Sequence, residues 1–385
     1  MLSLSKHEGR SLTPIRLAFF YAAFYTAMGV FLPFWPVWLA GKGLDAAEIG
    51  IVLAVGWAMR LVTTTLVGQI ADRRGERRPI MIVLAAGALV TYALYGVSDS
   101  LAAILVVTIL FSAFWNPIAP MSETLTVQVA RAEGFEYGRI RLWGSISFIL
   151  VAVGAGRLLM EHDSDILFAA GLAAVALTLL AAILLPGHKA QAVSESRFPL
   201  APVLRDRRFL LFLGASSCVH ASHAVYYGFS TLHWRSVGHT DTIIGALWAE
   251  GVIAEIILFG ASALLVRRIG PERLIALAGF ASVLRWSALA QTDWLPALIA
   301  VQALHAFSFG AAHLGAMHFI GRAVPPALLA TAQSVYSVAV VGLAVGLATA
   351  VSGGLYQSWG SQAYLGMAVL AALGTALAYG LGRAR

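Results

Sequence analysis

Long apolar stretches alternate with short polar segments along the whole chain. Each stretch holds about 20 residues or more, which is the length at which a helix crosses a hydrocarbon layer about 30 Å thick. Twelve such stretches fit, and no polar segment between them is long enough to fold as a separate soluble domain. The pattern predicts membrane-spanning helices at 15–40, 46–70, 79–98, 101–122, 139–160, 165–185, 209–234, 243–266, 274–291, 294–320, 328–352 and 361–382.

The composition agrees with a membrane protein. Of 385 residues, 59% are hydrophobic and 12% are charged, whereas about 25% of an ordinary soluble domain is charged. Cys218 is the only cysteine and lies within an apolar stretch, so the sequence contains neither a disulfide framework nor a thiolate metal site. The first apolar stretch has full span length and is flanked by Lys6, Arg10 and Arg16, so we do not expect a cleavable signal peptide.

The positions of the charges predict how the chain crosses the membrane. With the amino terminus in the cytoplasm, 21 of the 26 Lys and Arg residues fall on the cytoplasmic side. The opposite loops hold mainly acids, namely Asp45, Glu48, Asp99, Glu161, Asp163, Asp165, Asp241 and Asp293. Under the positive-inside rule, this asymmetry predicts a multi-pass protein of the bacterial inner membrane with both termini in the cytoplasm. The net charge of +7 is therefore explained without a nucleic-acid partner.

The chain also divides near its middle. A polar and basic segment separates the sixth predicted span from the seventh, and we expect two bundles, 1–186 and 209–385, joined by a cytoplasmic loop at 187–208. A basic turn follows span two at 68–78, and a similar turn follows span eight at 267–273, about half the chain later. Such a repeat is typical of transporters built from two parallel six-helix halves, with the substrate site at their interface.

The first of these turns reads Gly68-x3-Asp72-Arg73-x-Gly75-x-Arg77-Arg78. It resembles the loop signature of the major facilitator superfamily, although a generic basic loop is the simpler alternative. The resemblance implies an all-α membrane protein with twelve transmembrane helices in two pseudo-symmetric six-helix bundles. It also implies that the turn takes part in gating. The residues concerned are Gly68, Asp72, Arg73 and Gly75.

Several further segments resemble one branch of that superfamily. They are FLPFWPVWL (31–39), YGRIRLWGSISF (137–148), HASHAVYYGFS (220–230), LWAEGVIAEII (247–257), LRWS (284–287) and ALHAF (303–307). Together they are similar to the phenylpropionate permeases, which are related to the lactose–proton symporters. The resemblance implies proton-coupled uptake of a small aromatic or related monocarboxylate.

The resemblance also implies roles for individual residues. Glu123 and Arg141 match the acid and arginine with which lactose symporters hold their substrate. The proton-coupling positions correspond to Glu255, Arg285 and His305, although the spacing from Glu255 to Arg285 is a few residues shorter here. Ser308 is a departure, because lactose symporters have a proton-handling carboxylate at that position. The resemblance therefore implies that the proton is carried elsewhere in this chain, or that coupling is lost.

The residues themselves support a choice between two neighbouring arginines. Arg139 and Arg141 are two positions apart, so they point to different faces of one helix. We expect Arg141, which lies deeper in the span, to bind the substrate and Arg139 to extend to the membrane surface. A guanidinium suits a carboxylate substrate because its fork binds both oxygens. The alternative is that Glu123 and Arg141 are also interfacial residues.

Glu255 lies about 12 residues from either end of its predicted span, so its carboxylate cannot easily reach the membrane surface. It is either a structural partner of Arg285, a proton carrier, or both. His305 is a candidate because histidine titrates near neutrality. His220 and His223 lie one turn apart, but no cysteine or nearby acid completes a metal site, so we expect them to line a polar cavity.

Among the aromatic residues, we expect Phe148, Trp35 and Tyr226 to stack on an aromatic substrate. The other rings belong to the interfacial belt or to helix packing. We expect no metal and no cofactor, with the proton gradient as the driving force. The expected partners are a small-molecule substrate, protons and the lipid bilayer, and we expect a monomer.

The sequence thus predicts a proton-coupled secondary transporter that imports a small organic monocarboxylate, of the phenylpropionate type, by alternating access. Two alternatives remain, which are a proton symporter for a neutral sugar or nucleoside, and a drug exporter. A membrane sensor would be expected to have an added soluble domain. Enzymatic activity has no support, and the absence of a nucleotide-binding loop disfavours ATP as the energy source.

Overall fold

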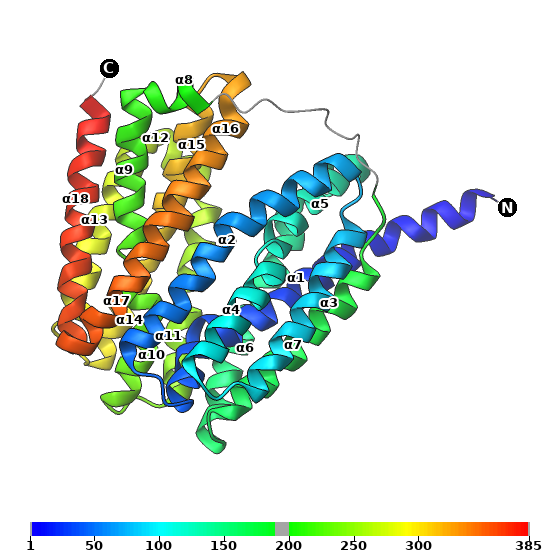
Figure 1. The fold of residues 1–385 in the computed structure, drawn as a ribbon. Helices are drawn as coiled ribbons and strands as arrows, with labels where there is room; N and C mark the ends of the chain where they lie inside the picture. Colours follow the sequence, from blue (N-terminus) through cyan, green and yellow to red (C-terminus); the bar gives the residue numbers. More distant parts are fainter. Residues whose placement is uncertain (1, 189–199, 384–385) are drawn as a thin grey trace. The chain divides into compact units, whose positions relative to one another are not determined.

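The structure is a computed structural model that describes residues 2–188 and 200–383 (Figure 1). Helices dominate this part of the chain. The α-helices are α1 (Leu2–Gly41), α2 (Ala46–Arg74), α3 (Arg78–Ala93), α4 (Leu101–Trp115), α5 (Ile118–Glu133), α6 (Tyr137–Glu161), α7 (Asp165–Leu184), α8 (Leu200–Arg205), α9 (Arg207–Ala221), α10 (Ala224–Ser236), α11 (Asp241–Gly260), α12 (Ser262–Ile269), α13 (Pro271–Leu289), α14 (Leu295–Ala303), α15 (Ala312–Ala323), α16 (Leu329–Tyr336), α17 (Val345–Trp359) and α18 (Ala363–Arg383). Short 3-10 or π segments are η1 (Leu94–Val97), η2 (Ala306–Ala311), η3 (Pro326–Leu328), η4 (Ser337–Ala344) and η5 (Gly360–Gln362).

Within the described residues, ten continuous helical segments are long and apolar enough to cross a membrane. One of them, Thr331–Arg383, is 53 residues long and contains two predicted spans, which meet at η5. The predicted span 274–291 lies on α13, whose charged residues Glu272, Arg273 and Arg285 keep this helix out of the group of ten. All twelve predicted spans therefore lie on helices.

The chain forms two compact units. Unit 1 comprises Met1–Lys42 and Met59–Ser196, and unit 2 comprises Gly43–Ala58 and Arg197–Arg385. The first part of α2 thus packs within unit 2, and the rest of the helix belongs to unit 1. The predicted bundle boundaries stay a prediction, because half of the loop at 187–208 lies outside the described residues. Lys189, Arg197 and Arg385, which contribute to the predicted charge asymmetry, also lie outside them.

In unit 1, α1 packs against α6 and α7, and α3 packs against α4 and α7. Aromatic rings fill part of the interior. Phe31, Trp35 and Trp38 lie four and three positions apart, so their rings share one face of α1. The Trp35 and Trp38 ring centroids are 4.5 Å apart and nearly parallel, and the Tyr95 ring lies 4.9 Å from Trp35. These contacts give the interior of unit 1 a rigid, ring-packed region.

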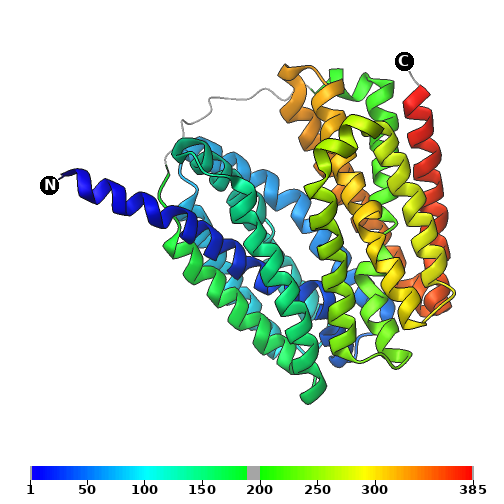
Figure 2. The same ribbon diagram turned by 180° about the vertical axis from the view of Figure 1, so that it is seen from behind.

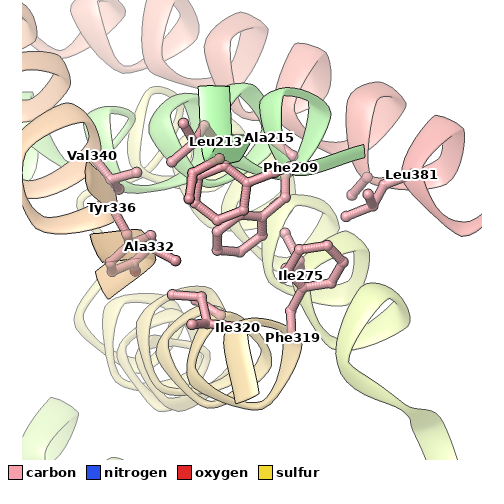
Figure 3. Packing of buried hydrophobic residues seen from close by; sticks show 14 of the residues in the cluster. Phe209, Leu213, Ala215, Ile275, Phe319, Ile320, Ala332, Tyr336, Val340 and Leu381 are labelled. Atoms are coloured by element: carbon pink, nitrogen blue, oxygen red, sulfur yellow. The ribbon is translucent and has the colours of Figure 1, made fainter. Parts of the chain in front are cut away.

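In unit 2, the helices α13 and α18 lie side by side, as Figures 1 and 2 show from opposite directions. A buried apolar cluster joins them to α9, α15 and α16 (Figure 3). Its centre includes Phe212, whose ring centroid lies 4.4 Å from that of Phe319. Ile275 of α13 and Leu381 of α18 are buried in the same cluster. This close packing holds the helices of unit 2, which carry its charged residues, in defined positions relative to one another.

Candidate functional site

A fully buried arginine is the centre of a polar network in unit 2. Arg285 of α13 is 0% exposed. Its Nη1 donates to Nδ1 of His305 at 2.7 Å and to the Ser308 hydroxyl at 3.3 Å. Its Nη2 donates to the Gln302 side-chain oxygen at 2.6 Å. The guanidinium carbon lies 4.2 Å from the centre of the Tyr226 ring, a cation–π distance.

The bonds around His305 define its tautomer. Because a guanidinium only donates, Nδ1 of His305 must be the unprotonated acceptor. The proton of the neutral ring is then on Nε2, which lies 2.8 Å from a carboxylate oxygen of Glu255 on α11. Hydrogen bonds thus run from Arg285 through the imidazole to the carboxylate. The three predicted proton-coupling residues are brought together, although their roles stay a prediction.

Gln302 is a member of this network that the sequence reasoning missed. Its side-chain nitrogen donates to the Tyr226 hydroxyl and to the Leu247 carbonyl, both at 2.9 Å, which orients the amide oxygen toward Arg285. The side chain is 0% exposed. A signal was present, because Gln302 lies three positions before His305 and therefore on the same helix face. A polar amide in an apolar stretch was a reason to include it.

The serine that departs from the lactose-symporter pattern also has a defined place. The Nδ1 atom of His223 lies 3.0 Å from the Val219 carbonyl, so this nitrogen is the donor. The Nε2 atom is then an acceptor, and the Ser308 hydroxyl lies 3.3 Å from it. Ser308 therefore bridges Arg285 and His223. His223 therefore belongs to the hydrogen-bonded surroundings of Arg285, and its role in lining a polar cavity stays a prediction.

In unit 1, the two neighbouring arginines of α6 have different surroundings. Arg141 donates to the Tyr25 hydroxyl, and its guanidinium carbon lies 4.1 Å from the Tyr25 ring centre and 5.6 Å from that of Tyr21. Arg139 forms an ion pair with Glu136 at 2.7 Å, and its side chain is 84% exposed. The expected difference in direction is thus seen, and Arg141 faces the aromatic wall of α1.

Glu123 of α5 completes the charged group of unit 1. It interacts electrostatically with Arg141 and with Arg60, the arginine in the middle of α2. The residue as a whole is exposed. A carboxylate and two guanidinium groups therefore share one region of this unit, and the assignment of Glu123 and Arg141 to substrate binding stays a prediction.

The three predicted stacking residues are divided between the two units. Phe148 of α6 is 4% exposed and Trp35 of α1 lies in the ring cluster, and both belong to unit 1. Tyr226 of α10 belongs to unit 2, where its ring contacts Arg285 and its hydroxyl accepts from Gln302. Each of these side chains has packing contacts of its own, and a role in substrate stacking stays a prediction.

The predicted gating motif forms the turn between α2 and α3. Gly75 has a φ of +69°, which is unfavourable for residues with a side chain. Asp72 accepts from Arg77 at 2.7 Å, and Arg77 also donates to Gln128 of α5 at 3.0 Å. The turn is thereby tied to a third helix. Gly68 and Arg73 lie on α2 before this turn, and Arg73 is exposed.

The equivalent turn of the second half has similar features. Gly270, between α12 and α13, has a φ of +83°. Glu272 accepts from Arg208 of α9 at 2.7 Å. Both turns therefore combine a glycine of positive φ with an acid–arginine pair, which agrees with the internal repeat seen in the sequence.

Comparison with known proteins gives a family match over most of the chain. The model of the MFS_1 like family matches residues 14–365. A probable 3-phenylpropionic acid transporter of Escherichia coli (strain K12) is 32% identical over 358 residues, or 92% of this chain and 94% of that protein. The maltose permease of Geobacillus stearothermophilus is 30% identical, and the match covers 88% of this chain and 87% of that protein. The lactose permease of Citrobacter freundii is 24% identical, covering 89% and 88%.

Solved structures resemble this one along nearly its full length. A D323A mutant of the nucleoside transporter NupG superposes with a TM-score of 0.86 at 17% identity, covering 96% of this chain and 99% of that one. A second structure is that of a bacterial homologue of the human lysosomal transporter Spinster in an inward-facing and occupied conformation. It superposes with a TM-score of 0.77 at 13% identity, and 97% of each chain is covered. At these identities the likeness concerns the fold, and it confirms the fold predicted from the sequence.

Proposed function

Since this chain belongs to the MFS_1 like family, we propose that it imports a small aromatic monocarboxylate of the phenylpropionate type together with a proton. The family makes it a multi-pass secondary transporter of the major facilitator superfamily and not an enzyme. The substrate class and the coupling ion are the parts that we propose. The relative described as a probable 3-phenylpropionic acid transporter, 32% identical over 92% of the chain, supports an aromatic carboxylate.

The observation that carries the substrate proposal is the position of Arg141 among the rings of α1. A guanidinium presents a planar fork that matches the two oxygens of a carboxylate. The partly exposed Tyr25 ring, whose centre lies 4.1 Å from the guanidinium carbon, is an apolar surface on which a phenyl group can stack. Glu123 is close enough to act on the charge of Arg141. Cation and rings are thus combined, as recognition of an aromatic acid requires.

The coupling proposal rests on the chain of bonds from Arg285 to Glu255. His305 accepts from Arg285 through Nδ1, so this nitrogen cannot take a proton while the bond persists. Glu255 at the other end of this chain of bonds is a carboxylate, and it is the group that takes the proton. Protonation removes the negative charge that attracts the Nε2 proton of His305, and this loosens the network. A carboxylate substrate faces an opposing potential of about 2.3 kcal/mol per charge per 100 mV, which a co-transported proton cancels.

A neutral sugar is the second candidate, because the maltose permease is 30% identical over 88% of the chain. Under this alternative, Arg141 and Glu123 would bind hydroxyl groups, and aromatic rings would stack on the sugar. The two candidates differ in how uptake depends on the charge of the substrate.

Uptake into proteoliposomes tests the proposal. Purified protein is reconstituted, an inward-directed proton gradient is imposed, and accumulation of labelled 3-phenylpropionate is measured. We expect accumulation that a protonophore abolishes and that unlabelled maltose or lactose does not reduce. If the protonophore leaves accumulation unchanged, the proton coupling is wrong. If maltose accumulates and phenylpropionate does not, the sugar alternative replaces the proposed substrate.

A further inference from the structure

The pair of helices α13 and α18 forms a cleft that the transport proposal does not use. The helices approach closely at Gly279, where a Cβ would lie 2.3 Å from the Thr375 hydroxyl oxygen and 3.2 Å from the Ala371 carbonyl. Beyond this point, toward the start of α13 and the end of α18, they bound a cleft of about 470 Å³. Figures 1 and 2 show the two helices adjacent in both views.

The charges around this cleft are mainly positive. Arg273 and Arg383 line it from opposite helices, and both are exposed. Glu272 is the only acid among the lining residues. Its carboxylate accepts a hydrogen bond from Arg208 at 2.7 Å, and 17% of the Glu272 side chain is exposed. The acid is therefore already neutralised by a third arginine. Two guanidinium groups remain available to an anion.

The walls and floor are apolar. Ala276 and Ala378 form the floor and belong to the buried core of unit 2, whose neighbouring members Ile275 and Leu381 are labelled in Figure 3. The rings of Phe280 and Tyr379 line the walls, although they are 54% and 65% exposed. Small side chains leave the space, and packing on the core keeps the floor rigid.

The order of these groups along the helices matches the order of groups in a phospholipid. Phe280 follows Arg273 by seven positions, which is about two helical turns on the same face. Tyr379 precedes Arg383 by four positions, also on the same face. On both helices the arginine thus lies at the end of the predicted span, and the ring lies deeper within it. In a bilayer, the phosphate groups lie at the level of the two arginines, and the acyl chains lie at the level of the two rings.

We propose that the cleft between α13 and α18 binds an anionic phospholipid, with its phosphate between Arg273 and Arg383 and its acyl chains along Phe280 and Tyr379. The two exposed rings favour a lipid over a water-soluble phosphate, because they would gain burial only from acyl chains. The absence of a free carboxylate among the lining residues favours an anionic headgroup over one with an ammonium group. The positive-inside pattern predicts the cytoplasmic leaflet.

Lipid binding to the purified full-length protein tests this site. Native mass spectrometry compares phosphatidylglycerol with phosphatidylethanolamine of the same acyl chains, and sn-glycerol 3-phosphate serves as a water-soluble competitor. We expect phosphatidylglycerol to bind in preference, and the soluble phosphate not to displace it. Equal retention of the two lipids would mean that the cleft makes only unspecific contacts with lipid. Displacement by the soluble phosphate would mean that the cleft binds phosphate ions and not a lipid. Either result overturns the proposal.

Variants separate a specific site from general charge attraction. The double variant Arg273→Gln/Arg383→Gln removes both cations, and we expect the affinity for phosphatidylglycerol to fall on the order of tenfold. The control is Arg267→Gln/Arg268→Gln, which removes two exposed arginines of α12 that do not line the cleft. We expect this control to keep the wild-type affinity. An equal loss in both would contradict a defined site.

A second pair of variants keeps every charge. Gly382 lines the cleft and Gly380 does not, and a Cβ at either position meets nothing within 4 Å. Gly382→Leu fills the cleft, so we expect weaker binding of phosphatidylglycerol, whereas Gly380→Leu leaves it unchanged. If Gly382→Leu binds as tightly as the wild type, the lipid does not occupy this cleft.

Discussion

Arg285 shows how a charged residue is accommodated inside this protein. Its hydrogen bonds run to the neutral acceptors His305, Gln302 and Ser308, and its guanidinium lies against the faces of Tyr226 and Trp286. A buried charge is costly unless its donors are satisfied, and here both terminal nitrogens have partners, whereas Nε has none among the described residues. Because the carboxylate of Glu255 contacts the imidazole that accepts from Arg285, a change of charge at Glu255 can reach the arginine by way of His305.

Neutralising Glu255 tests this relay. We expect Glu255→Gln to abolish accumulation driven by a proton gradient, because the amide cannot take up or release the proton. Exchange of external labelled substrate for internal unlabelled substrate should continue, since exchange needs no net proton movement. The control is Glu250→Gln, one turn and a half earlier on α11, which should keep both activities. Protonophore-sensitive accumulation by Glu255→Gln would refute the assignment.

The two arginines of α6 provide a second test at the residue scale. Arg141→Ala removes a charge-assisted hydrogen bond to the proposed carboxylate, a loss of about 1.5–3 kcal/mol, so we expect the substrate affinity to fall about ten- to a hundredfold. Arg139→Ala removes only an exposed ion pair with Glu136, which is worth at most about 1 kcal/mol. Binding of labelled phenylpropionate measures both, and a comparable loss in the two variants would remove Arg141 from the site.

Among helices, a close backbone contact in unit 2 joins the first part of α2 to α17. A Cβ on Gly353 would lie 2.4 Å from the Ala46 carbonyl oxygen and 3.0 Å from the Cα atom of Gly50. Backbones come this close only where side chains are absent, as is common between membrane helices. The contact explains why Gly43–Ala58 groups with unit 2, although the rest of α2 belongs to unit 1.

Filling this contact should destabilise the protein. We expect Gly353→Leu to cost about 1–3 kcal/mol through overpacking and to lower the apparent melting temperature in detergent. Gly354→Leu is the matched control, because the neighbouring glycine is exposed and a Cβ there meets nothing within 4 Å. Thermal unfolding of the two variants measures the difference. Equal melting temperatures would mean that the two helices separate easily at this point.

At the scale of the whole molecule, the distribution of charge predicts the orientation. One set of loops contains few basic residues, and 21 of the 26 Lys and Arg residues lie in the other set and the termini. Anionic lipids of the cytoplasmic leaflet attract basic segments, and translocation of Lys and Arg across the membrane is disfavoured. Both termini are therefore expected in the cytoplasm.

Cysteine labelling measures this orientation. In a Cys218→Ser background, Gln291→Cys places a thiol in the exposed loop after α13, and Glu133→Cys places one at the exposed C-terminal end of α5. We expect an impermeant maleimide to label Gln291→Cys in intact cells and to label Glu133→Cys only after the membrane is permeabilised. The reverse pattern would invert the topology, and labelling of both in intact cells would contradict the predicted spans.

The sequence by itself determined the number and positions of the spans, because a helix needs about 20 apolar residues to satisfy its backbone within hydrocarbon. It also determined the family, through motifs distributed over both halves. It distinguished Arg141 from Arg139, because a two-residue separation turns a side chain to another face of the helix. These features depend on local composition and helical period.

Only the tertiary structure decided which polar groups meet. Arg285 reaches Gln302, His305 and Ser308 across 17 to 23 positions of the chain, and Ser308 reaches His223 across 85. The packing of helix faces determines the order of contacts from Arg285 through His305 to Glu255 and the participation of Gln302 in this network. It also determines that the first part of α2 groups with unit 2. Hydropathy reports that a side chain lies within a span, but not which neighbouring helix it faces, because that depends on shape complementarity among residues far apart in sequence.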